Sequence, residues 1–356
     1  MKIDFVVNSL VAGGAERVLI LLANNFDKKG HDVTIITFNE PEVFSANPTV
    51  KRVRLHNGNI KNHTIRSTIN LYKYYSNKNN RPDVLMPFMT QTNFIGALIG
   101  KLRGLKVVSA EHNNHLRATD FIGKLARKYM YRKSDALTVL TKFDEQHYKS
   151  IGVNVYVMPN PCTFDIYEES KRNRKKIILA VGDLNRYHHK GFDNLIPLIT
   201  PVLKKNPQWK LKLVGGGDDG TKLLKELTQK HQIEDQVIFE GYSTKVAELM
   251  TESEIYVLSS RTEGLPMVLT EAFARGTACI AFDCVTGPSD IIIPNVNGIL
   301  IEDQNYDAMA ESLEKLMNDA ELRIKLTKGG VNSLDRYKMD AVYNKYLNIF
   351  DDILNK

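Results

Sequence analysis

Several common signals are scarce in this 356-residue sequence. It holds three cysteines, Cys162, Cys279 and Cys284, and their odd number and spacing fit neither a disulfide framework nor a zinc site. No apolar run approaches the roughly 18–20 residues that span a bilayer, and the one at the N-terminus is too short for a signal peptide. We therefore expect a cytoplasmic protein without a membrane-spanning helix.

Two ligand-binding motifs are also missing. No Asp-x-Asp pair occurs, so nothing indicates a metal-bound diphosphate, and we expect neither a metal nor a cofactor. The strand predicted at Ile3–Val7 is followed by Gly13-Gly14 rather than by Gly-x-Gly-x-x-Gly, which disfavours an ordinary dinucleotide site. Two glycines at a strand-to-helix turn still let a phosphate approach free backbone N–H groups, although a tight turn without function looks the same.

Positive charge is concentrated in the first half of the chain. Residues 1–170 hold 23 Lys and Arg against 15 Asp and Glu, a balance of +8, whereas residues 171–356 hold 25 against 26, a balance of −1. A cationic domain favours binding to nucleic acid or to an anionic membrane surface. A basic domain without such a partner is the alternative.

Short apolar strands alternate with helical patterns twice along the chain, which predicts an α/β protein with two doubly wound, mostly parallel sheets. We expect an N-terminal domain over 1–160, a charged linker over 161–176 and a C-terminal domain over 177–335. A helix over 336–356 can cross back to the N-terminal domain. Ligands bind at the carboxyl ends of strands in such sheets, so a cleft between the domains is the expected site.

The most informative segment runs from Glu263 through Gly-Leu-Pro to Glu271. If 267–275 is helical, Glu271 lies one turn into the helix and Glu263 lies in the loop before it. Two carboxylates and the free N–H groups of a helix N-terminus suit a ligand that carries both hydroxyl and phosphate groups. The segment therefore indicates sugar-nucleotide chemistry.

Other segments fit the same ligand. Arg186 and Lys190 follow the strand predicted at Ile177–Val181 and can neutralise a diphosphate, although two solvated loop cations are the alternative. Gly216 lies in a Gly-Gly-Gly turn after the next strand, and Gly241 follows the strand after that, where each lets a nucleotide approach the backbone.

A basic segment in the first half mixes cations with apolar and aromatic residues. Such a helix suits an anionic membrane surface or a lipid diphosphate, and a solvated basic helix with its apolar side in the core is the alternative. The cations are Lys124, Arg127, Lys128, Arg132 and Lys133.

Five motifs occur in a fixed order: Gly13-Gly-Ala-Glu-Arg, Lys190-Gly-Phe-Asp, Gly215-Gly-Gly, Glu263-Gly-Leu-Pro…Glu271-Ala and Gly287-Pro-Ser-Asp. Together they resemble the retaining GT-B glycosyltransferases of family 4 (group 1 type), which include bacterial capsule, O-antigen and lipid-linked oligosaccharide transferases. The similarity covers nearly the whole chain, and the ordered set carries it rather than any one motif.

The resemblance implies a role for individual residues. Glu271 would bind ribose hydroxyls, Glu263 would contact the donor sugar and face its reacting carbon, and Lys190 would bind the diphosphate. His112, in Ala110-Glu-His-Asn, matches the active-site histidine beside the donor sugar. Donor-binding positions implied by the resemblance or by the glycine turns also include Gly13, Gly14, Arg186, Gly216, Gly241, Gly264, Leu265, Pro266, Met267 and Val268.

Two positions depart from the family pattern. Asp183 stands where the family has an arginine, so Arg186, three residues later, is expected to replace it. Pro266 removes one backbone N–H from the sugar-contacting loop.

The expected function follows from these motifs together. We expect transfer, with retained configuration, of a hexose or N-acetylhexosamine from a nucleoside-diphosphate sugar, with UDP favoured. The acceptor would be a growing, undecaprenyl-linked glycan at the inner face of the plasma membrane, and no nucleic acid would bind. The alternatives are a sugar-nucleotide epimerase on a related two-domain fold and, from another class, a nucleic-acid-binding module.

Overall fold

The computed structural model describes residues 1–11, 13–167 and 174–355. These residues form two compact units. The first unit is Met1–Pro161 together with Lys338–Lys356, and the second unit is Cys162–Tyr337. Residues 168–173 of the charge run in the expected linker lie outside the described residues, and the remainder of that run enters a strand that begins at Lys175.

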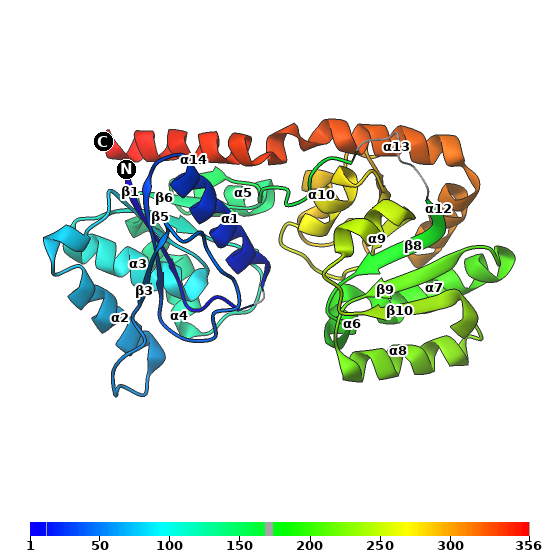
Figure 1. Cartoon of the computed structure of the whole chain (residues 1–356), viewed down its shortest axis with the longest axis horizontal. Coiled ribbons are helices and arrows are strands. Elements are labelled where there is room, and N and C mark those ends of the chain that lie inside the picture. The colour runs from blue at the N-terminus through cyan, green and yellow to red at the C-terminus, as the bar shows by residue number, and fades with distance from the viewer. Residues whose placement is uncertain (12, 168–173, 356) are drawn as a thin grey trace. The chain divides into compact units, whose positions relative to one another are not determined.

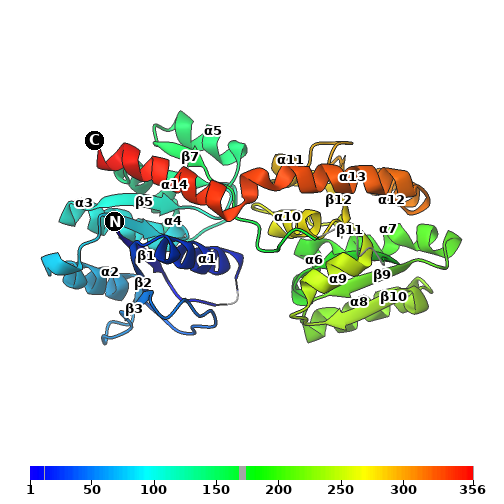
Figure 2. The ribbon, with the colours of Figure 1, turned by 45° about the horizontal axis from the view of Figure 1, so that its top comes forward.

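The first unit is built on a seven-stranded, fully parallel sheet with the order β3-β2-β1-β4-β5-β6-β7. Its central strands are mostly buried and rich in apolar side chains, which is typical of strands covered on both faces. Figure 2 shows β1, β2 and β3 side by side, with helices around them. The elements in chain order are β1 (Lys2–Val7), α1 (Gly14–Lys28), β2 (Asp32–Thr37), β3 (Lys51–Arg54), α2 (His63–Tyr74), η1 (Lys78–Asn80), β4 (Val84–Pro87), α3 (Thr90–Arg103), β5 (Lys106–Ala110), α4 (Phe121–Leu125), η2 (Ala126–Met130), η3 (Tyr131–Lys133), β6 (Ala136–Val139), α5 (Lys142–Ser150) and β7 (Val155–Val157).

The last helix of the chain, α14 (Met339–Leu354), packs in the first unit beside α1 (Figure 1). The Phe26 ring of α1 lies 4.9 Å from that of Tyr343 and 5.7 Å from that of Phe350, measured between centroids. His31 also pairs with the Tyr343 hydroxyl at 2.9 Å. Aromatic burial therefore fixes α14 to a unit whose other elements all end by Val157.

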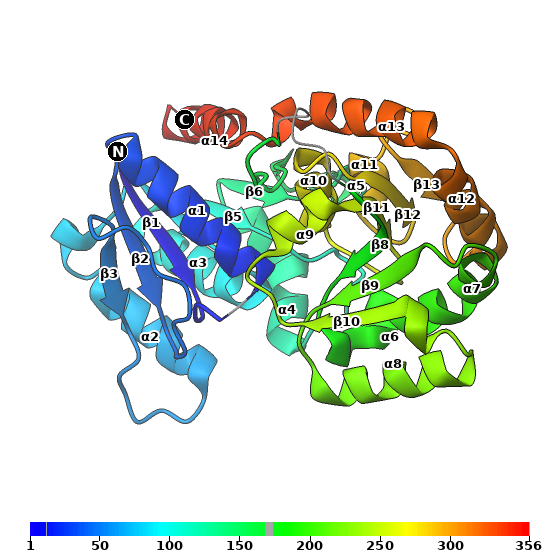
Figure 3. The ribbon, with the colours of Figure 1, turned by 45° about the vertical axis from the view of Figure 1, so that its right-hand side comes forward.

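The second unit is built on a six-stranded parallel sheet with the order β10-β9-β8-β11-β12-β13, and Figure 3 shows β8, β9 and β10 side by side. Its core includes Trp209 and the apolar faces of the surrounding helices. The elements in chain order are β8 (Lys175–Val181), η5 (Leu184–Arg186), α6 (Tyr187–Lys190), α7 (Phe192–Lys205), β9 (Lys210–Val214), α8 (Asp218–Lys230), η6 (Glu234–Gln236), β10 (Val237–Gly241), α9 (Val246–Glu252), β11 (Ser253–Leu258), α10 (Met267–Ala274), β12 (Ala278–Phe282), α11 (Pro288–Ile291), β13 (Ile299–Ile301), α12 (Tyr306–Asn318), α13 (Ala320–Asn332) and η7 (Ser333–Tyr337).

Both units are therefore α/β and Rossmann-like, with parallel sheets whose strand order reverses about the first strand, and the predicted fold class is confirmed. Among the described residues, no helix is both long and apolar enough to cross a membrane.

Asp4 is a buried carboxyl in the middle of β1. Its side chain is 0% exposed and accepts a 2.8 Å hydrogen bond from the Tyr75 hydroxyl. Burial raises the pKa of Asp4 from 3.8 to about 6, although the Tyr75 hydrogen bond opposes the change. The folded state therefore holds the proton more tightly than the unfolded chain. The stability that this proton provides is complete below about pH 4 and is lost as the pH rises towards 6.

We expect Asp4→Asn to remove this pH dependence. A pKa change of this size corresponds to about 3 kcal/mol at neutral pH. The free energy of unfolding of the variant, relative to the wild type, should therefore rise by about that amount between pH 4 and pH 7. Urea unfolding of both proteins at each pH measures this difference, and a difference that stays constant with pH would refute the account of Asp4.

Candidate active site

Lys190 and Glu263 form an ion pair in the second unit, in the segments that follow β8 and β11. Lys190 Nζ lies 2.8 Å from Glu263 Oε1, and the two side chains are 17% and 11% exposed. Ser260 Oγ donates a second hydrogen bond, of 2.6 Å, to the same carboxylate oxygen. Two predicted site residues, 73 positions apart in the chain, are thus brought together at the carboxyl edge of the sheet.

The lysine segment and the glutamate segment are held together by backbone contacts. Gly191 has φ +69°, and a Cβ atom there would lie 1.9 Å from the carbonyl oxygen of Ser259, so only glycine fits. Ser259 Oγ donates to the carbonyl of Lys190 at 2.9 Å. Arg261 forms an ion pair with Asp193 at 2.7 Å and donates its backbone N–H to the carbonyl of His189. These contacts fix Lys190 relative to Glu263 before any ligand binds.

The loop after β12 packs on the glutamate segment. Gly287 has φ +100°, and a Cβ atom there would lie 2.2 Å from the carbonyl oxygen of Gly264. Thr286 Oγ1 donates to the carbonyls of Glu263 and Gly264 at 3.1 and 3.2 Å. The Gly287-Pro-Ser-Asp motif therefore has a structural reason to accompany the Glu263 motif, because one loop supports the other.

Helix α10 begins at Met267, with Pro266 as its N-cap, as the sequence predicts. The N–H groups of Met267 and Val268 lie in the first turn, where a helix leaves amides without an intrahelical partner. Glu271 is buried, with 4% of its surface exposed, and accepts a 2.5 Å hydrogen bond from Thr163 Oγ1. Leu265 and Pro266 are buried as well, so this part of the loop is fixed by packing.

The glycine turns pack against the segment that follows β8. Gly215 has φ +153°, and a Cβ atom there would lie 1.8 Å from the carbonyl oxygen of Gly182. Gly216 accepts a backbone hydrogen bond from Leu184, and Gly241 accepts one from Gly215. The exposed ring of Tyr242 follows Gly241, at the end of β10. The glycines thus bring the ends of β8, β9 and β10 close together.

Arg186 and Asp183 occupy the ends of a short 3-10 turn. Asp183 caps the turn by accepting the N–H of Asn185 at 2.9 Å, so its carboxylate has a local structural role. The Arg186 side chain is exposed. The adjacent histidines separate, since His188 contacts Asp193 and His189 contacts Thr262.

The predicted residues of the first unit lie near the carboxyl ends of β1 and β5. Gly13 caps α1, and a Cβ atom there would lie 2.2 Å from Glu16 Oε2, because the Glu16 carboxylate folds back over it. Gly14, the first residue of α1, borders open space. His112 stacks on the Phe88 ring at 5.0 Å, and burial lowers the pKa of His112 to about 4, so the ring is neutral at pH 7.

The basic segment is helical but irregular, with a π-helical turn between α4 and η3. Lys124, Lys128, Arg132 and Lys133 are exposed. Arg127 differs, because its guanidinium donates to the carbonyls of His115 and Arg117 at 2.8 and 2.7 Å and lies 4.0 Å from the buried Glu111.

Comparison with known proteins decides the family. A model described as Glycosyl transferases group 1 matches residues 163–332, and one described as Glycosyltransferase Family 4 matches residues 12–165. The chain belongs to the group 1, family 4 glycosyltransferases.

Similar proteins agree with this assignment over full length. A Campylobacter jejuni protein is 29% identical over 100% of this glycosyltransferase and 99% of its own chain. It is named GalNAc-alpha-(1->4)-GalNAc-alpha-(1->3)-diNAcBac-PP-undecaprenol alpha-1,4-N-acetyl-D-galactosaminyltransferase. The lipopolysaccharide outer core galactosyltransferase WaaB, in its apo form, superposes with a TM-score of 0.81 at 20% identity, covering 99% of each chain. Anabaena Alr3699/HepE in complex with UDP superposes with a TM-score of 0.79 at 15% sequence identity, covering 99% of this chain and 100% of its own. These structures confirm the GT-B fold.

Four residues that no sequence motif indicates position the candidate site in this glycosyltransferase. Ser260 and Thr286 hold Glu263 and its loop, Arg261 holds the lysine segment, and Thr163 holds Glu271. Ser260 lies three residues before Glu263, and side chains this close in a loop can form a hydrogen bond. Nothing in the sequence, however, distinguishes Ser260 from the other serines in loops.

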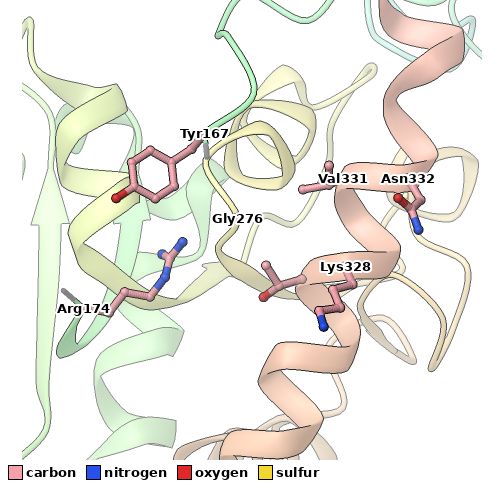
Figure 4. Close-up of a pocket in the computed structure, with 7 residues that line it drawn as sticks. Tyr167, Arg174, Gly276, Lys328, Val331 and Asn332 are labelled. Carbon is pink, nitrogen blue, oxygen red and sulfur yellow. The ribbon is translucent and has the colours of Figure 1, made fainter. Parts of the chain in front are cut away.

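A separate hollow of about 290 Å³ lies at the opposite edge of the second unit's sheet, where Arg174 and Gly276 precede β8 and β12. Figure 4 shows Tyr167 and Arg174 on one side of it and Lys328 on helix α13 on the other. Arg174 donates to the carbonyls of Ser253 and Arg275, so its charge tethers the chain before β8. The described residues that line this hollow include none of the predicted site residues.

Proposed function

We propose that this glycosyltransferase moves a hexose or N-acetylhexosamine, with retained configuration, from a UDP-sugar to an undecaprenyl-linked bacterial surface glycan. The observation that carries the proposal is the Lys190–Glu263 ion pair, placed just before helix α10 and its buried Glu271. One cation, two carboxylates and a helix N-terminus match the diphosphate, sugar and ribose of one nucleotide sugar.

The chemistry assigned to these residues is stabilisation of charge. The bond between the sugar C1 and the diphosphate oxygen breaks, and its electron pair leaves with the diphosphate. Lys190 and the first-turn amides of α10 stabilise that negative charge, and the exposed Arg186 adds to it. The acceptor hydroxyl oxygen bonds to C1 on the same face, and its proton passes to the departing diphosphate.

In this proposal, Glu263 contacts Lys190 before the donor binds and the donor sugar afterwards. It holds Lys190 in the structure described above, and it faces the sugar once the diphosphate has taken over the lysine. Ser260 keeps the carboxylate in place during that exchange, because it donates to the same oxygen independently of Lys190. His112, which is neutral, would contribute a hydrogen bond to the donor sugar rather than a charge.

The names of similar proteins support the donor and the acceptor. The Campylobacter jejuni relative is named for a GalNAc transfer to a PP-undecaprenol-linked saccharide, and the Anabaena structure contains UDP. The basic segment with Lys124, Lys128, Arg132 and Lys133 would contact an anionic membrane surface. The epimerase alternative has no support in the two family models, since both describe glycosyltransferases.

A nucleotide panel tests the donor site. UDP at about 100 times its dissociation constant should stabilise the folded protein by about 2.7 kcal/mol, whereas GDP and ADP at the same concentration should do less. Glu271→Ala should lose most of the UDP effect, because the ribose hydroxyls lose their acceptor. Thermal unfolding measures both results, and the absence of stabilisation by every nucleoside diphosphate would contradict the proposal.

A further inference from the structure

Two hollows lie side by side in the first unit, and their linings differ in chemistry. The first, of about 330 Å³, follows the ends of β1, β4 and β5. Half of its lining residues are uncharged and polar, and Arg117 and Arg127 line it as well. The uncharged polar residues include Asn8, Ser9, Gln91, Thr92 and Asn113, with the Glu16 carboxylate beside them. Amide, hydroxyl and carboxylate groups at a strand-end hollow of this size suit the hydroxyl groups of a sugar.

The second hollow is larger, about 530 Å³, and cationic. Arg117, Lys124, Lys128 and Arg132 line it. Leu116, with 62% of its surface exposed, and Ile151 add apolar surface. Several cations around one concavity raise the local concentration of an anion and favour phosphate.

Two histidines complete the second hollow. The His115 and His147 rings stack face to face, with centroids 4.0 Å apart and planes 2° apart, and His115 Nδ1 pairs with Asp144 at 2.8 Å. Burial lowers the pKa of His147, and its proximity to His115 lowers it further. Lysines and arginines are the permanently charged groups of the hollow.

One wall separates the hollows and belongs to both. Residues 117–119 and Arg127 line each of them. Arg127 supports the wall from behind by donating to the carbonyls of His115 and Arg117, and Arg117 Nη1 donates to Asn113 Oδ1 at 2.6 Å. Because both hollows border this one short segment, they adjoin each other.

We propose that the two hollows bind one acceptor molecule, a saccharide joined to a phosphate, with the sugar in the polar hollow and the phosphate in the cationic one. This inference rests on the proposed transferase function and specifies its acceptor. Since the hollows share lining residues, the phosphate lies close along the acceptor to the sugar in the polar hollow. The reaction that supplies the acceptor is therefore one that forms a glycosyl phosphate ester, and Leu116 contacts the hydrocarbon on the far side of the phosphate.

Matched ligands test the proposal on the full chain without any donor. N-acetylglucosaminyl octyl phosphate and octyl N-acetylglucosaminide share a sugar and a tail and differ in the phosphate. Calorimetric titration should show at least about tenfold tighter binding of the phosphodiester, the effect of one or two charge-assisted hydrogen bonds. Equal affinity of the wild type for the two compounds would overturn the proposal.

Three variants divide the roles of the hollows. Lys128→Ala should remove most of the preference for the phosphodiester, whereas Lys101→Ala, an equal loss of charge on the exposed end of α3, should preserve it. Gln91→Ala should weaken the binding of both compounds by the same factor, because Gln91 lines the polar hollow but not the cationic one. Unchanged melting temperatures would show that the variants fold, and an unchanged preference in Lys128→Ala would contradict the phosphate site.

A membrane surface predicts a different pattern. Lys133 belongs to the same basic segment but is not among the described residues that line the cationic hollow. If Lys133→Ala and Lys128→Ala reduce the phosphodiester preference equally, and both weaken binding to phosphatidylglycerol vesicles equally, general surface charge explains the segment and the proposal fails. Because these titrations contain no nucleotide, their outcome is separate from that of the nucleotide panel, which tests the donor site.

Discussion

Replacing Lys190 with methionine is expected to lower the turnover number about 10²–10³-fold, the usual cost of losing one group that stabilises charge in a transition state. Lys190 is the cation that the ion pair with Glu263 holds at the strand edge. In the proposed mechanism, the departing diphosphate gains negative charge in the same place. Methionine keeps the length and apolar stem of the side chain. The rate of UDP release at saturating donor measures the effect.

A second lysine in the same unit provides the control. Lys212 pairs with Glu240 at 2.9 Å and is 12% exposed, so Lys212→Met also removes a largely buried ion-pair lysine. It lies within β9, and its substitution should leave turnover near the wild-type value. An equal loss of turnover in both variants would mean that Lys190 acts through stability alone.

Glu263→Gln should lower the turnover number about as much, although the glutamine amide keeps nearly the shape of the carboxylate. The negative charge faces the sugar in the proposed mechanism and stabilises positive charge that develops at C1 as the diphosphate leaves. Glutamine can still accept the hydrogen bonds of Ser260 and Lys190 through its carbonyl oxygen, so the loop should remain in place. Single-turnover kinetics with a UDP-sugar isolate the chemical step.

The matching control is Glu240→Gln, which neutralises the acid of the other ion pair. Its single-turnover rate should stay within a few-fold of the wild-type rate. A wild-type rate in Glu263→Gln would show that the carboxylate charge is not needed for the chemistry.

Alternating patterns were enough to predict the two parallel sheets, because each buried strand is a short apolar run between helices. Strand β3 was missed, since Lys51, Arg52 and Arg54 dominate its four residues and an edge strand need not be apolar. Helix α13 was also missed, because it has a weak apolar face and two glycines, Gly329 and Gly330, that pack closely on the chain at Val296 and on Phe273.

For the candidate site as well, the sequence predicts some features and leaves others hidden. Residue types, motif order and the family resemblance led to the prediction of Lys190, Glu263 and Glu271 as site residues, and the structure brings Lys190 and Glu263 together. Their support depends on contacts between distant loops, such as Gly287 against Gly264 and Thr163 with Glu271, and local patterns do not encode those contacts. Arg127 is a further example. The spacing of the basic segment does not reveal that the guanidinium of Arg127 is turned inward and donates to backbone carbonyls.

In the proposed mechanism, Lys190 exchanges the Glu263 carboxylate for the diphosphate of the donor. Calorimetric titration of UDP into the wild type and Glu263→Gln tests this exchange most directly, because UDP lacks the sugar that Glu263 would contact. A neutral amide oxygen accepts a weaker hydrogen bond from Lys190 than the carboxylate does. The lysine is therefore held less tightly, and UDP should bind the variant several-fold to about tenfold more tightly. Weaker or unchanged binding would contradict the exchange and show that the ion pair does not compete with the diphosphate.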